Sequence, residues 1–480
     1  MKKERSIMSF GMAAVVMGLI IFLMICGMLI FKIKLPILLF VCWLIVVPFA
    51  YKIGMSYAEL QNGAFEMIRK GMEAIAIILV VGALTGAWIA SGTVPGLIYL
   101  GLKIMAPKFF LITTLFLCSI VSLATGTSWG TLATAGLACM GIGEGLGIPA
   151  GMTAGAVVCG AYFGDKMSPL SDTTNMAPAV AGTDVITHIK HMVYTTGPAY
   201  LITAVIFLVF GFKYGSGNVD MASVNALMDS ISGIFNVGFI VYIPAIVVIT
   251  LLVRKQSPVT SILIGGVIGV LVAVFYQGYT LTVAAGSMYT GFSGEFGNAF
   301  LNKLLNRGGM VSMQELATIM IAGLGLGGML RASGVLPALV TKLTTLIKSV
   351  GSLVVTTVVI CIMGLGIGGS MAFTHVMTGT LMAPVFRDFK LKPENLSRIL
   401  EDAGTMAAPL IPWGGSGIYT ATMLQVPVYV YAPYCFLNYL TPIISIIYGF
   451  TGFSMKKYTD EELVELQKLD NAHIRLDTIS

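Results

Sequence analysis

Long apolar runs separated by short polar breaks extend along almost the whole chain. Runs of about the length that a membrane-spanning helix needs lie at residues 9–31, 35–53, 72–91, 109–124, 192–212, 234–253, 258–276, 315–331, 351–367 and 427–452. Further apolar segments, interrupted by Gly, Pro and hydroxyl residues, lie at 132–143, 150–163, 370–386 and 403–424. Because lipid offers no partner to a free backbone group, we expect some of these interrupted segments to be re-entrant. The pattern predicts an all-α polytopic membrane protein with about 10–12 transmembrane segments.

The composition leaves little room for a soluble domain. Of the 480 residues, 56% are hydrophobic and 10% are charged, and the mean hydropathy is +0.90, whereas a soluble domain carries about 25% charged residues. The one sizeable charged stretch is the tail from about Ser454. There Thr459 and Glu462 have the spacing of a capping box, ahead of Leu463, Leu466 and Leu469 on one helix face.

Neither the charge nor the cysteines point to a nucleic acid or a cofactor. The net charge of +6 needs no nucleic-acid partner, because the cytoplasmic loops of membrane proteins collect Lys and Arg. The seven cysteines are scattered without a CxxC pair or a metal-binding spacing, so we expect them to be small buried hydrophobes. No bound cofactor is predicted.

The orientation follows from the ends of the apolar runs. The run 9–31 is too long for the core of a signal peptide, so we interpret it as a first transmembrane helix with its N-terminus in the cytoplasm. The positive-inside rule also places Arg69-Lys70 and Arg254-Lys255 in the cytoplasm. The loop 387–398 carries charges of both signs and is not placed by this rule.

Three pairs of short motifs recur in the same order at nearly constant separation. Ser91-Gly92-Thr93-Val94-Pro95 matches Ser333-Gly334-Val335-Leu336-Pro337, and Gly126-Thr127-Ser128 matches Gly368-Gly369-Ser370. Pro169-Leu170 then matches Pro409-Leu410. The matches indicate a duplicated unit at about 70–190 and 312–425, the alternative being chance similarity between Gly-rich membrane segments.

The duplication and the orientation together predict inverted repeats. If Arg254-Lys255 is cytoplasmic, the single crossing 258–276 leaves the second unit starting on the outside. Inverted repeats are typical of secondary transporters, whose binding site lies at the bilayer midplane on broken helices. The expected organisation is N-terminal transmembrane helices and an interfacial segment (1–68), a first repeat (70–190), connecting helices (191–311), a second repeat (312–425), a last transmembrane helix (426–453) and a cytoplasmic tail (454–480).

Polar islands interrupt each repeat at corresponding places. In the first repeat, residues 125–131 contain Thr127 and Ser128 among glycines, and their hydroxyls and freed carbonyls are hard ligands suited to Na⁺. The alternative is that this Gly/Ser/Thr stretch serves close helix packing. In the second repeat, the island 368–380 contains Ser370, Thr374 and His375, a histidine that is either a hydrogen-bonded packing residue or a proton carrier.

The most polar island is the stretch 165–175. A charged side chain at membrane depth costs at least about 2.5–3.5 kcal/mol, so this island is either an extramembrane loop or the lining of a watery cavity. The apolar residues within it and the run 177–182 after it favour the cavity. Pro169 predicts a break in the helix, and Lys166 could neutralise a carboxylate. The island contains the carboxylates of Asp165 and Asp172, four hydroxyls and the amide of Asn175.

Its counterpart in the second repeat contains Glu401, Asp402 and Thr405. Adjacent acids can simply cap a helix N-terminus, but their match to the island 165–175 favours a functional role. A carboxylate in a cavity of low dielectric holds a proton near neutral pH until a cation replaces it. Competition between H⁺ and Na⁺ for such carboxylates, here Asp165 and Asp172 with neighbouring hydroxyls, is sufficient for antiport.

Other classes of membrane protein fit less well. A metal-dependent intramembrane protease would need an HExxH motif, and the sequence contains none. A channel favours a ring of repeated filter segments, which the paired, non-identical halves do not resemble. A carboxylate exchanger on the same scaffold stays open, with His375 or Lys166 as the positive partner of an organic anion.

Two stretches resemble a known family. The run 160–175, followed by Gly182-Thr183-Asp184 and residues 188–192, resembles the signature of the NhaC-type Na⁺/H⁺ antiporters. Residues 401–405 and 409–413 resemble the second signature of that family. The resemblance covers residues 10–455 and implies a secondary transporter of the ion-transporter superfamily in the bacterial inner membrane, with two inverted repeats and re-entrant hairpins.

This resemblance also implies a substrate and a site. The expected exchange is Na⁺, with Li⁺ as a further candidate, against H⁺. The alternative within the same family is a Na⁺- and H⁺-coupled carboxylate exchanger for malate and lactate. Membrane lipid is an expected partner, and a homodimer is a further expectation. The sequence departs from many relatives at Gly414-Gly415-Ser416-Gly417, where Asn or Thr would follow the Pro-Trp pair. The implied site residues are Thr127, Ser128, Asp165, Asp172, Thr173, Thr174, Asn175, Ser370, Thr374, His375, Glu401, Asp402 and Thr405.

Overall fold

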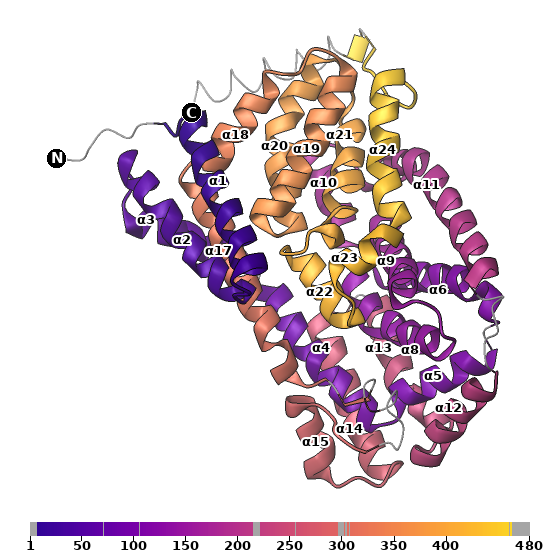
Figure 1. The fold of residues 1–480 in the computed structure, drawn as a ribbon. Coiled ribbons are helices and arrows are strands. Elements are labelled where there is room, and N and C mark those ends of the chain that lie inside the picture. Colours follow the sequence, from indigo (N-terminus) through magenta and orange to yellow (C-terminus); the bar gives the residue numbers. More distant parts are fainter. Residues whose placement is uncertain are drawn as a thin grey trace.

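The computed structural model describes residues 7–459 apart from 71, 105, 215–220, 255, 296–301, 303, 304 and 307, together with 461 and 462. Within these residues every regular element is a helix (Figure 1). The one β-type pairing among them is an isolated antiparallel bridge between Leu391 and Lys457. The fold is therefore all-α, as the apolar pattern predicts.

The N-terminal and connecting regions contain helices on either side of the first repeat. Their bounds are α1 (Phe10–Ile25), η1 (Cys26–Ile30), α2 (Leu35–Lys52), α3 (Tyr57–Lys70), α12 (Met221–Ile234), η4 (Phe239–Tyr242), α13 (Ile243–Val253), α14 (Pro258–Phe275), α15 (Leu281–Thr290) and η5 (Met310–Met313).

The first predicted repeat and the helix after it consist of α4 (Met72–Ala90), α5 (Thr93–Ile104), η2 (Pro107–Phe109), α6 (Phe110–Thr125), α7 (Ser128–Thr131), η3 (Leu132–Gly136), α8 (Leu137–Gly145), α9 (Ala150–Met167), α10 (Asp172–Ala181) and α11 (Val185–Tyr214). The second consists of α17 (Gln314–Ala332), α18 (Val335–Thr344), α19 (Val350–Gly368), α20 (Met371–Asp388), α21 (Pro393–Ile399), η6 (Leu400–Thr405), η7 (Ala408–Leu410), α22 (Gly415–Leu424), α23 (Val428–Tyr431), η8 (Ala432–Tyr434) and α24 (Phe436–Thr451).

Several of these helices can cross a membrane by length and composition. In the described part of the chain they are Leu35–Lys52, Pro107–Thr125, Val185–Tyr214, Met310–Ala332 and Val350–Gly368. Three bent pairs bring the number from 5 to 8 if each pair is one span. The protein is therefore a polytopic membrane protein, while the total of about 10–12 crossings stays a prediction because the shorter and broken helices escape this test.

Most helices coincide with the predicted apolar runs, and the differences have local causes. The run 192–212 lies within the longer α11, which begins at Val185 because the carboxylate of Asp184 accepts the backbone N–H of Thr187 at 2.9 Å. The run 234–253 starts at a bend of 93° between α12 and η4, and the rest of it is formed by η4 and α13. The run 427–452 is likewise bent, by 59°, between η8 and α24.

Two segments that were expected to be broken are continuous helices. The segment 150–163 lies within α9 and the segment 370–386 lies within α20. The glycines of α9 serve close packing: a Cβ on Gly160 would lie 2.5 Å from the carbonyl oxygen of Leu115, and one on Gly164 would lie 2.4 Å from the backbone nitrogen of Leu123. They bring α9 against α6 and do not interrupt the helix.

The helices of the two predicted repeats follow one another in the same order, with glycines at matching turns. Gly92 and Gly334 have φ of +75° and +78° at the ends of α4 and α17, and Gly126 and Gly369 have φ of +71° and +63° at the ends of α6 and α19. Only glycine adopts this left-handed conformation without strain. This parallel supports the duplication, and the inverted orientation of the second unit stays a prediction.

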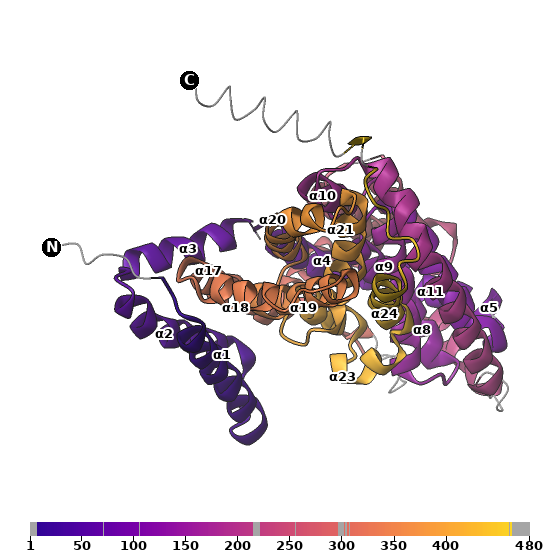
Figure 2. The same cartoon turned by 90° about the horizontal axis from the view of Figure 1, so that it is seen from above.

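The two sets of helices also pack across each other reciprocally. Helix α10 packs on α20, while α22 packs on η3 and α8; at the periphery α14 packs on α4, while α3 packs on α17. Seen from above, α1–α3 lie to one side and contact the rest through α17 and α18 (Figure 2). The broken ends of α9, α10 and η6 therefore lie inside the molecule, covered by helices of both halves.

Two smaller predictions can be checked directly. Six cysteines are buried and Cys26 is half-buried, all as free thiols, which confirms their structural role. The capping box is present, with Thr459 N–H donating to Glu462 Oε2 at 2.8 Å and Glu462 N–H donating to Thr459 Oγ1 at 3.3 Å. Leu463, Leu466 and Leu469 lie outside the described residues.

Candidate functional site

Asp165 lies in the last turn of α9, at the break between α9 and α10. The break spans 168–171 because Pro169 has no N–H to continue the helix and disfavours a helical Ser168. Thr174, from the first turn of α10, closes the end of α9 by donating its hydroxyl to the carbonyls of Asp165 at 3.0 Å and Lys166 at 2.9 Å. The break is thus a fixed turn that keeps the carboxylate in place.

The carboxylate of Asp165 is buried and bound by two hydroxyls. Ser128 Oγ donates to Oδ2 at 2.6 Å and Ser171 Oγ donates to Oδ1 at 2.6 Å, while only 5% of the residue is exposed. Such short bonds to a carboxylate are charge-assisted and stabilise the ionised form. They bring a serine from the 125–131 island and a serine from the 165–175 island onto one side chain.

The other candidates of the 165–175 island have different surroundings. Asp172 lies exposed in the first turn of α10, seven positions from Asp165 but outside the buried cluster. Asn175 is also exposed, and its amide holds the turn by donating to the carbonyls of Pro169 at 2.9 Å and Ser171 at 2.7 Å. Thr173 is buried, with its hydroxyl 3.1 Å from that of Ser171.

The 125–131 island contacts the break at 168–171 at Gly126. A Cβ on Gly126 would lie 2.8 Å from the carbonyl carbon of Leu170, so no larger residue allows the two breaks to touch. Thr127 caps α7, accepting the N–H of Gly130 at 3.4 Å, and so directs the next residue, Ser128, at Asp165. Among the described residues Thr127 makes no hydrogen bond to the carboxylate. Its carbonyl accepts the hydroxyl of Thr131 at 2.9 Å, so its role is in the local fold.

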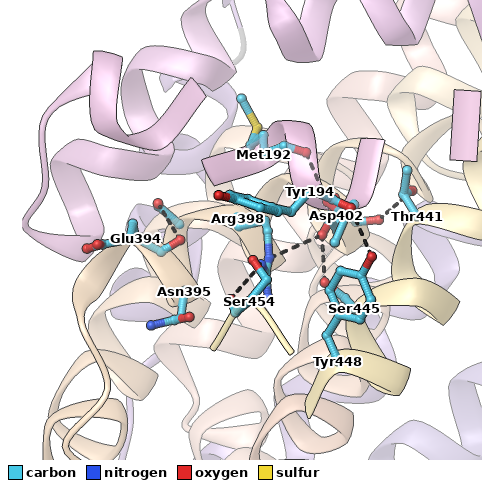
Figure 3. A network of polar contacts seen from close by, with 12 residues as sticks. Met192, Tyr194, Glu394, Asn395, Arg398, Asp402, Thr441, Ser445, Tyr448 and Ser454 are labelled. Carbon is cyan, nitrogen blue, oxygen red and sulfur yellow. Dashed lines mark hydrogen bonds and ion pairs between the residues drawn. The ribbon is translucent and has the colours of Figure 1, made fainter. Parts of the chain in front are cut away.

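Asp402 lies on η6 of the second half and is fully buried with four side-chain partners, of which Arg398 and Ser445 are labelled in Figure 3. Lys166 and Thr195 both donate to Oδ1, the hydroxyl of Thr195 at 3.0 Å; Ser445 donates to Oδ2 at 2.6 Å. The Nε atom of Arg398 lies 3.9 Å from Oδ2. With its oxygens committed in this way, Asp402 acts as the counter-ion of Lys166.

Glu401, the residue before it, has the opposite environment. Its side chain is 0% exposed, yet neither carboxylate oxygen has a hydrogen-bond partner in the described part of the chain. The charges of Lys166 and Asp165 act on it, and the hydroxyls of Thr405 and Thr173 lie beside it without hydrogen-bond geometry. A buried carboxyl group without a donor is costly as an anion, so Glu401 is poised to take up a proton or a metal cation.

The remaining candidates of the second half line the same region without touching Asp165. His375 Nε2 lies 3.0 Å from the carbonyl oxygen of Leu400 and 3.3 Å from Thr405 Oγ1. Ser370 caps α20 and Thr374 donates to the Ser370 carbonyl at 2.9 Å. Because its Nε2 must donate to a carbonyl, His375 is a packed, hydrogen-bonded histidine in this state.

His188 and His191 lie in the first two turns of α11, ahead of the apolar run 192–212. Both are 0% exposed on α11, where His188 Nδ1 lies 2.8 Å from Ser397 Oγ. The apolar run that marked the start of this helix at 192 was too short by two turns, which placed both residues outside it. The helix in fact buries them against α21.

The site as a whole carries an excess of negative charge. Three buried carboxylates (Asp165, Glu401 and Asp402) lie near two buried cations (Lys166 and Arg398). When all are ionised, one negative charge remains, which is expensive in a low dielectric unless a monovalent cation joins it. The cluster therefore suits a proton or an alkali cation with oxygen ligands, and the second half contributes as much as the first.

Sequence reasoning missed several residues of this cluster. Ser171 lies within the island 165–175 but is not among the predicted ligands. Its position directly before the start of α10 at Asp172 turns its side chain toward the break. Arg398 stands four residues before Asp402, the spacing that places two side chains on one helix face. Thr195 and Ser445 gave no signal, because single hydroxyls are ordinary in membrane helices.

The fold and the site together define a class: an all-helical, multi-pass membrane protein with an ionisable cluster buried between two helical halves. Ionisable groups inside such a bundle mark the pathway of an ion or substrate. The Na⁺/H⁺ antiporter family model matches residues 160–453. The chain belongs to this family, which confirms the resemblance seen in the motifs.

Three relatives indicate the range of this family. The chain is 40% identical over 455 residues, 95% of its length and 97% of the relative, to the malate-2H⁺/Na⁺-lactate antiporter of Bacillus subtilis. It is 35% identical to the Na⁺/H⁺ antiporter NhaC of Alkalihalophilus pseudofirmus, over 93% of this chain and 96% of the relative. It is 32% identical to the arginine/ornithine antiporter ArcD of Halobacterium salinarum, over 86% of each chain.

Proposed function

We propose that this protein exchanges Na⁺, with Li⁺ as a further candidate, for H⁺ by alternating access. The observation that carries the proposal is the carboxylate of Asp165, buried at a helix break with Ser128 and Ser171 at 2.6 Å. Two hydroxyl oxygens around one carboxylate are hard ligands of the kind that an alkali cation prefers. The name of the NhaC relative supports the same exchange.

Exchange follows from competition for one negative charge. In the state described here both hydroxyls donate to Asp165; rotation of either hydroxyl would turn an oxygen lone pair toward an entering cation. Glu401 offers a second, unpartnered carboxylate from the other half. A proton or a Na⁺ ion can neutralise the excess charge, and binding one displaces the other. Lys166 stays on Asp402, so its charge does not block the site.

Alternating access would use the junction of the two halves. Asp165 belongs to the first half and Glu401 to the second, and reciprocal contacts of α10 with α20 and of α22 with η3 cover them. A movement of one half against the other would open the junction to one side at a time, as in transporters with inverted repeats. We place the protein in a bacterial cytoplasmic membrane with its N-terminus inside, consistent with the positive-inside rule; a homodimer stays a prediction.

Vesicles containing the purified protein test this function. When a pH gradient is imposed with the acid side inside, addition of Na⁺ or Li⁺ outside should drive proton efflux into the outer solution, and choline should have no effect. Vesicles that respond to neither cation between about pH 6 and 9 would rule out simple antiport.

The second candidate is a Na⁺- and H⁺-coupled carboxylate exchanger for malate and lactate. It is favoured by the relative at 40% identity, whose name states such an exchange. Radiolabelled malate uptake that depends on an opposing lactate gradient would support it. If neither a malate nor a lactate gradient changes uptake in vesicles that exchange Na⁺ for H⁺, the carboxylate exchange is ruled out and only the cation exchange is supported.

A further inference from the structure

The buried guanidinium of Arg398 has no part in the exchange proposed above, although it is an expensive group to bury. Arg398 lies on α21, one turn before Asp402, and is 0% exposed. A buried arginine needs partners because it stays charged at all ordinary pH values; here Nε has an ion pair but no hydrogen bond within the described residues, and the two Nη atoms have closer contacts. Its partners lie in two directions.

Inward, Arg398 faces the counter-ion of the site lysine. Its Nε lies 3.9 Å from Asp402 Oδ2, and the other oxygen of that carboxylate holds Lys166, the neighbour of Asp165. Tyr448 of α24 lies under the guanidinium, 5.9 Å from the ring centroid, and His191 of α11 is a further neighbour that interacts with its charge. Arg398 is thus the second cation on Asp402.

Outward, Arg398 holds the segment 452–458, which we name the C-terminal strap. Its Nη1 donates to the carbonyl of Ser454 at 3.0 Å and to Ser454 Oγ at 2.9 Å. Its Nη2 lies 3.3 Å from the sulfur of Met455, which is buried. These bonds use the face of the guanidinium turned away from Asp402 (Figure 3).

The strap is itself fixed on the loop before α21. Lys392 N–H donates to the carbonyl of Lys456 and Tyr458 N–H to that of Lys390, both at 3.0 Å, and Asn395 accepts the N–H of Lys456 at 3.0 Å. Ser454 adopts φ of +55°, a left-handed conformation that costs a non-glycine residue roughly 1 kcal/mol or more. The conformation persists because it aims both Ser454 oxygens at Arg398.

We propose that Arg398 is a positioning residue for the ion exchange, and that the C-terminal strap is the element that fixes it. Held from outside by Ser454, Arg398 keeps Asp402 oriented toward Lys166 and adds a positive charge beside the exchanging carboxylates. The inference rests on the proposed cation exchange, whose site it extends from the buried cluster to the end of α24.

The proposal predicts a shift in the pH profile of exchange. Without the positive charge of Arg398, the three nearby carboxylates hold their protons more tightly, so a higher pH is needed before Na⁺ can replace them. A unit charge about 8–10 Å away at an effective dielectric near 20 corresponds to about one pH unit. Arg398→Gln should therefore move the half-maximal rate of Na⁺-driven proton exchange toward alkaline pH by about one unit, and Arg398→Lys should restore most of it.

The strap is tested by a matched pair of variants at one position. Ser454→Gly keeps the left-handed turn and the carbonyl acceptor, whereas Ser454→Val penalises that turn strongly because valine is β-branched. We expect the glycine variant to keep the wild-type profile to within about 0.3 units and the valine variant to shift it in the same direction as Arg398→Gln. Lys457→Gln, an exposed change within the strap, is the control that should have no effect.

The outcomes separate this proposal from the function on which it rests. Wild-type vesicles without Na⁺-driven exchange would refute the proposed function. Active wild type with superimposable normalised profiles for Arg398→Gln and Ser454→Val would overturn the positioning role, since a merely structural arginine lowers the amount of active protein without moving the profile. If Arg398→Gln does not fold, the Ser454 pair alone decides, because the strap lies at the surface end of α24.

Discussion

Asp165 and Asp172 lie seven residues apart in one polar island, yet only Asp165 is buried and bound by hydroxyls. We therefore expect Asp165→Asn to abolish Na⁺-driven proton exchange in vesicles, since the amide cannot carry the exchangeable charge. Asp172→Asn, at an exposed position, should leave at least roughly a third of the rate, because exposed charges interact weakly. Equal loss in both variants would contradict the assignment of the site to Asp165.

The serines that hold Asp165 give a graded test. Each hydroxyl bond to a charged group is worth about 1.5–3 kcal/mol. Ser128→Ala and Ser171→Ala should each raise the KM for Na⁺ by roughly tenfold or more while leaving a measurable maximal rate. Ser261→Ala is the matched control, because the buried Ser261 hydroxyl donates to the carbonyl of Ser257 at 2.9 Å at the start of α14, outside the cluster. A KM unchanged in both alanine variants would mean that the serines do not act on the ion.

At this scale the sequence predicted which islands contain the buried carboxylates, but not which side chain of each island is buried. Asp165 was a candidate from its setting alone, and its burial needed the structure. Ser171 was overlooked because the length of the break after Pro169 decides whether a side chain turns inward. Asp402 was grouped with Glu401 as a ligand. Its saturation by Lys166, Thr195 and Ser445 depends on contacts across 236, 207 and 43 residues of sequence, which no local pattern encodes.

Among the elements, the crossing of the two breaks near Asp165 depends on Gly126. Gly126→Ala adds a Cβ within 2.8 Å of the Leu170 backbone at φ of +71°, whereas Gly182→Ala meets nothing within 4 Å at φ of +90°. Both variants have the backbone strain of about 1–2 kcal/mol, and only the first has the steric overlap, worth about 1–3 kcal/mol more. We expect Gly126→Ala to lower the thermal unfolding temperature of the purified protein clearly more than Gly182→Ala; equal effects would mean that the crossing can relax.

The attachment of the tail to the loop before α21 should not depend on pH in the physiological range. Lys392 Nζ lies 2.6 Å from Glu462 Oε1, and this bond lowers the pKa of Glu462 and raises the pKa of Lys392. Because the pKa of Glu462 is lowered, the contact is fully formed at every pH above the pKa of this carboxyl in the unfolded chain, and it is lost only in acid. Because the pKa of Lys392 is raised, the contact is lost at high pH only in strong base.

Hydrogen exchange of the peptide 452–462 checks this expectation. Its protection, corrected for the intrinsic rate, should be the same between about pH 6 and 9, and Glu462→Gln should reduce it at every pH in that range. Protection that falls within this window would place a titrating group in the tail itself and would weaken the view that the pH response of exchange comes from the buried cluster.

The helices were largely predictable from the sequence. Because whole runs are apolar, the length of each run and the positions of its breaks predict a helix without any 3.6-residue periodicity. The predictions fail where close helix packing outweighs the tendency of glycine to break a helix. The segment 150–163 looked broken because it is rich in glycine, but these residues let α9 lie against α6. Gly417 is also required by close packing, because a Cβ there would lie 2.0 Å from the carbonyl oxygen of Ile411. Close backbone packing therefore explains why residues 414–417 depart from the Asn or Thr expected after the Pro-Trp pair.

For the whole molecule, a site between two halves predicts that the transported ion stabilises the fold. Na⁺ at about 100 times its dissociation constant should add about 2.7 kcal/mol to the stability of the state that binds it. The thermal unfolding temperature of purified protein should therefore rise with Na⁺ and Li⁺ but not with choline, at equal ionic strength. Asp165→Asn should remove the rise; a variant that keeps it would locate the ion elsewhere.

The predicted duplication would link the sequence to this behaviour. The three recurring motifs fall at left-handed turns and breaks, which explains why such short matches persist at constant separation. The reciprocal packing of α10 on α20 and of α22 on η3 was not predictable, because it depends on how the halves face each other. That arrangement brings Asp165 of one half near Glu401 of the other.

The most direct measurement is the release of protons when Na⁺ is added to purified protein in weakly buffered detergent solution near neutral pH. The account predicts that wild type releases protons in saturable proportion to the Na⁺ bound and that Asp165→Asn releases none. Sodium binding to wild type without proton release, or an undiminished release from Asp165→Asn, would contradict the claim that the two cations compete for this buried carboxylate.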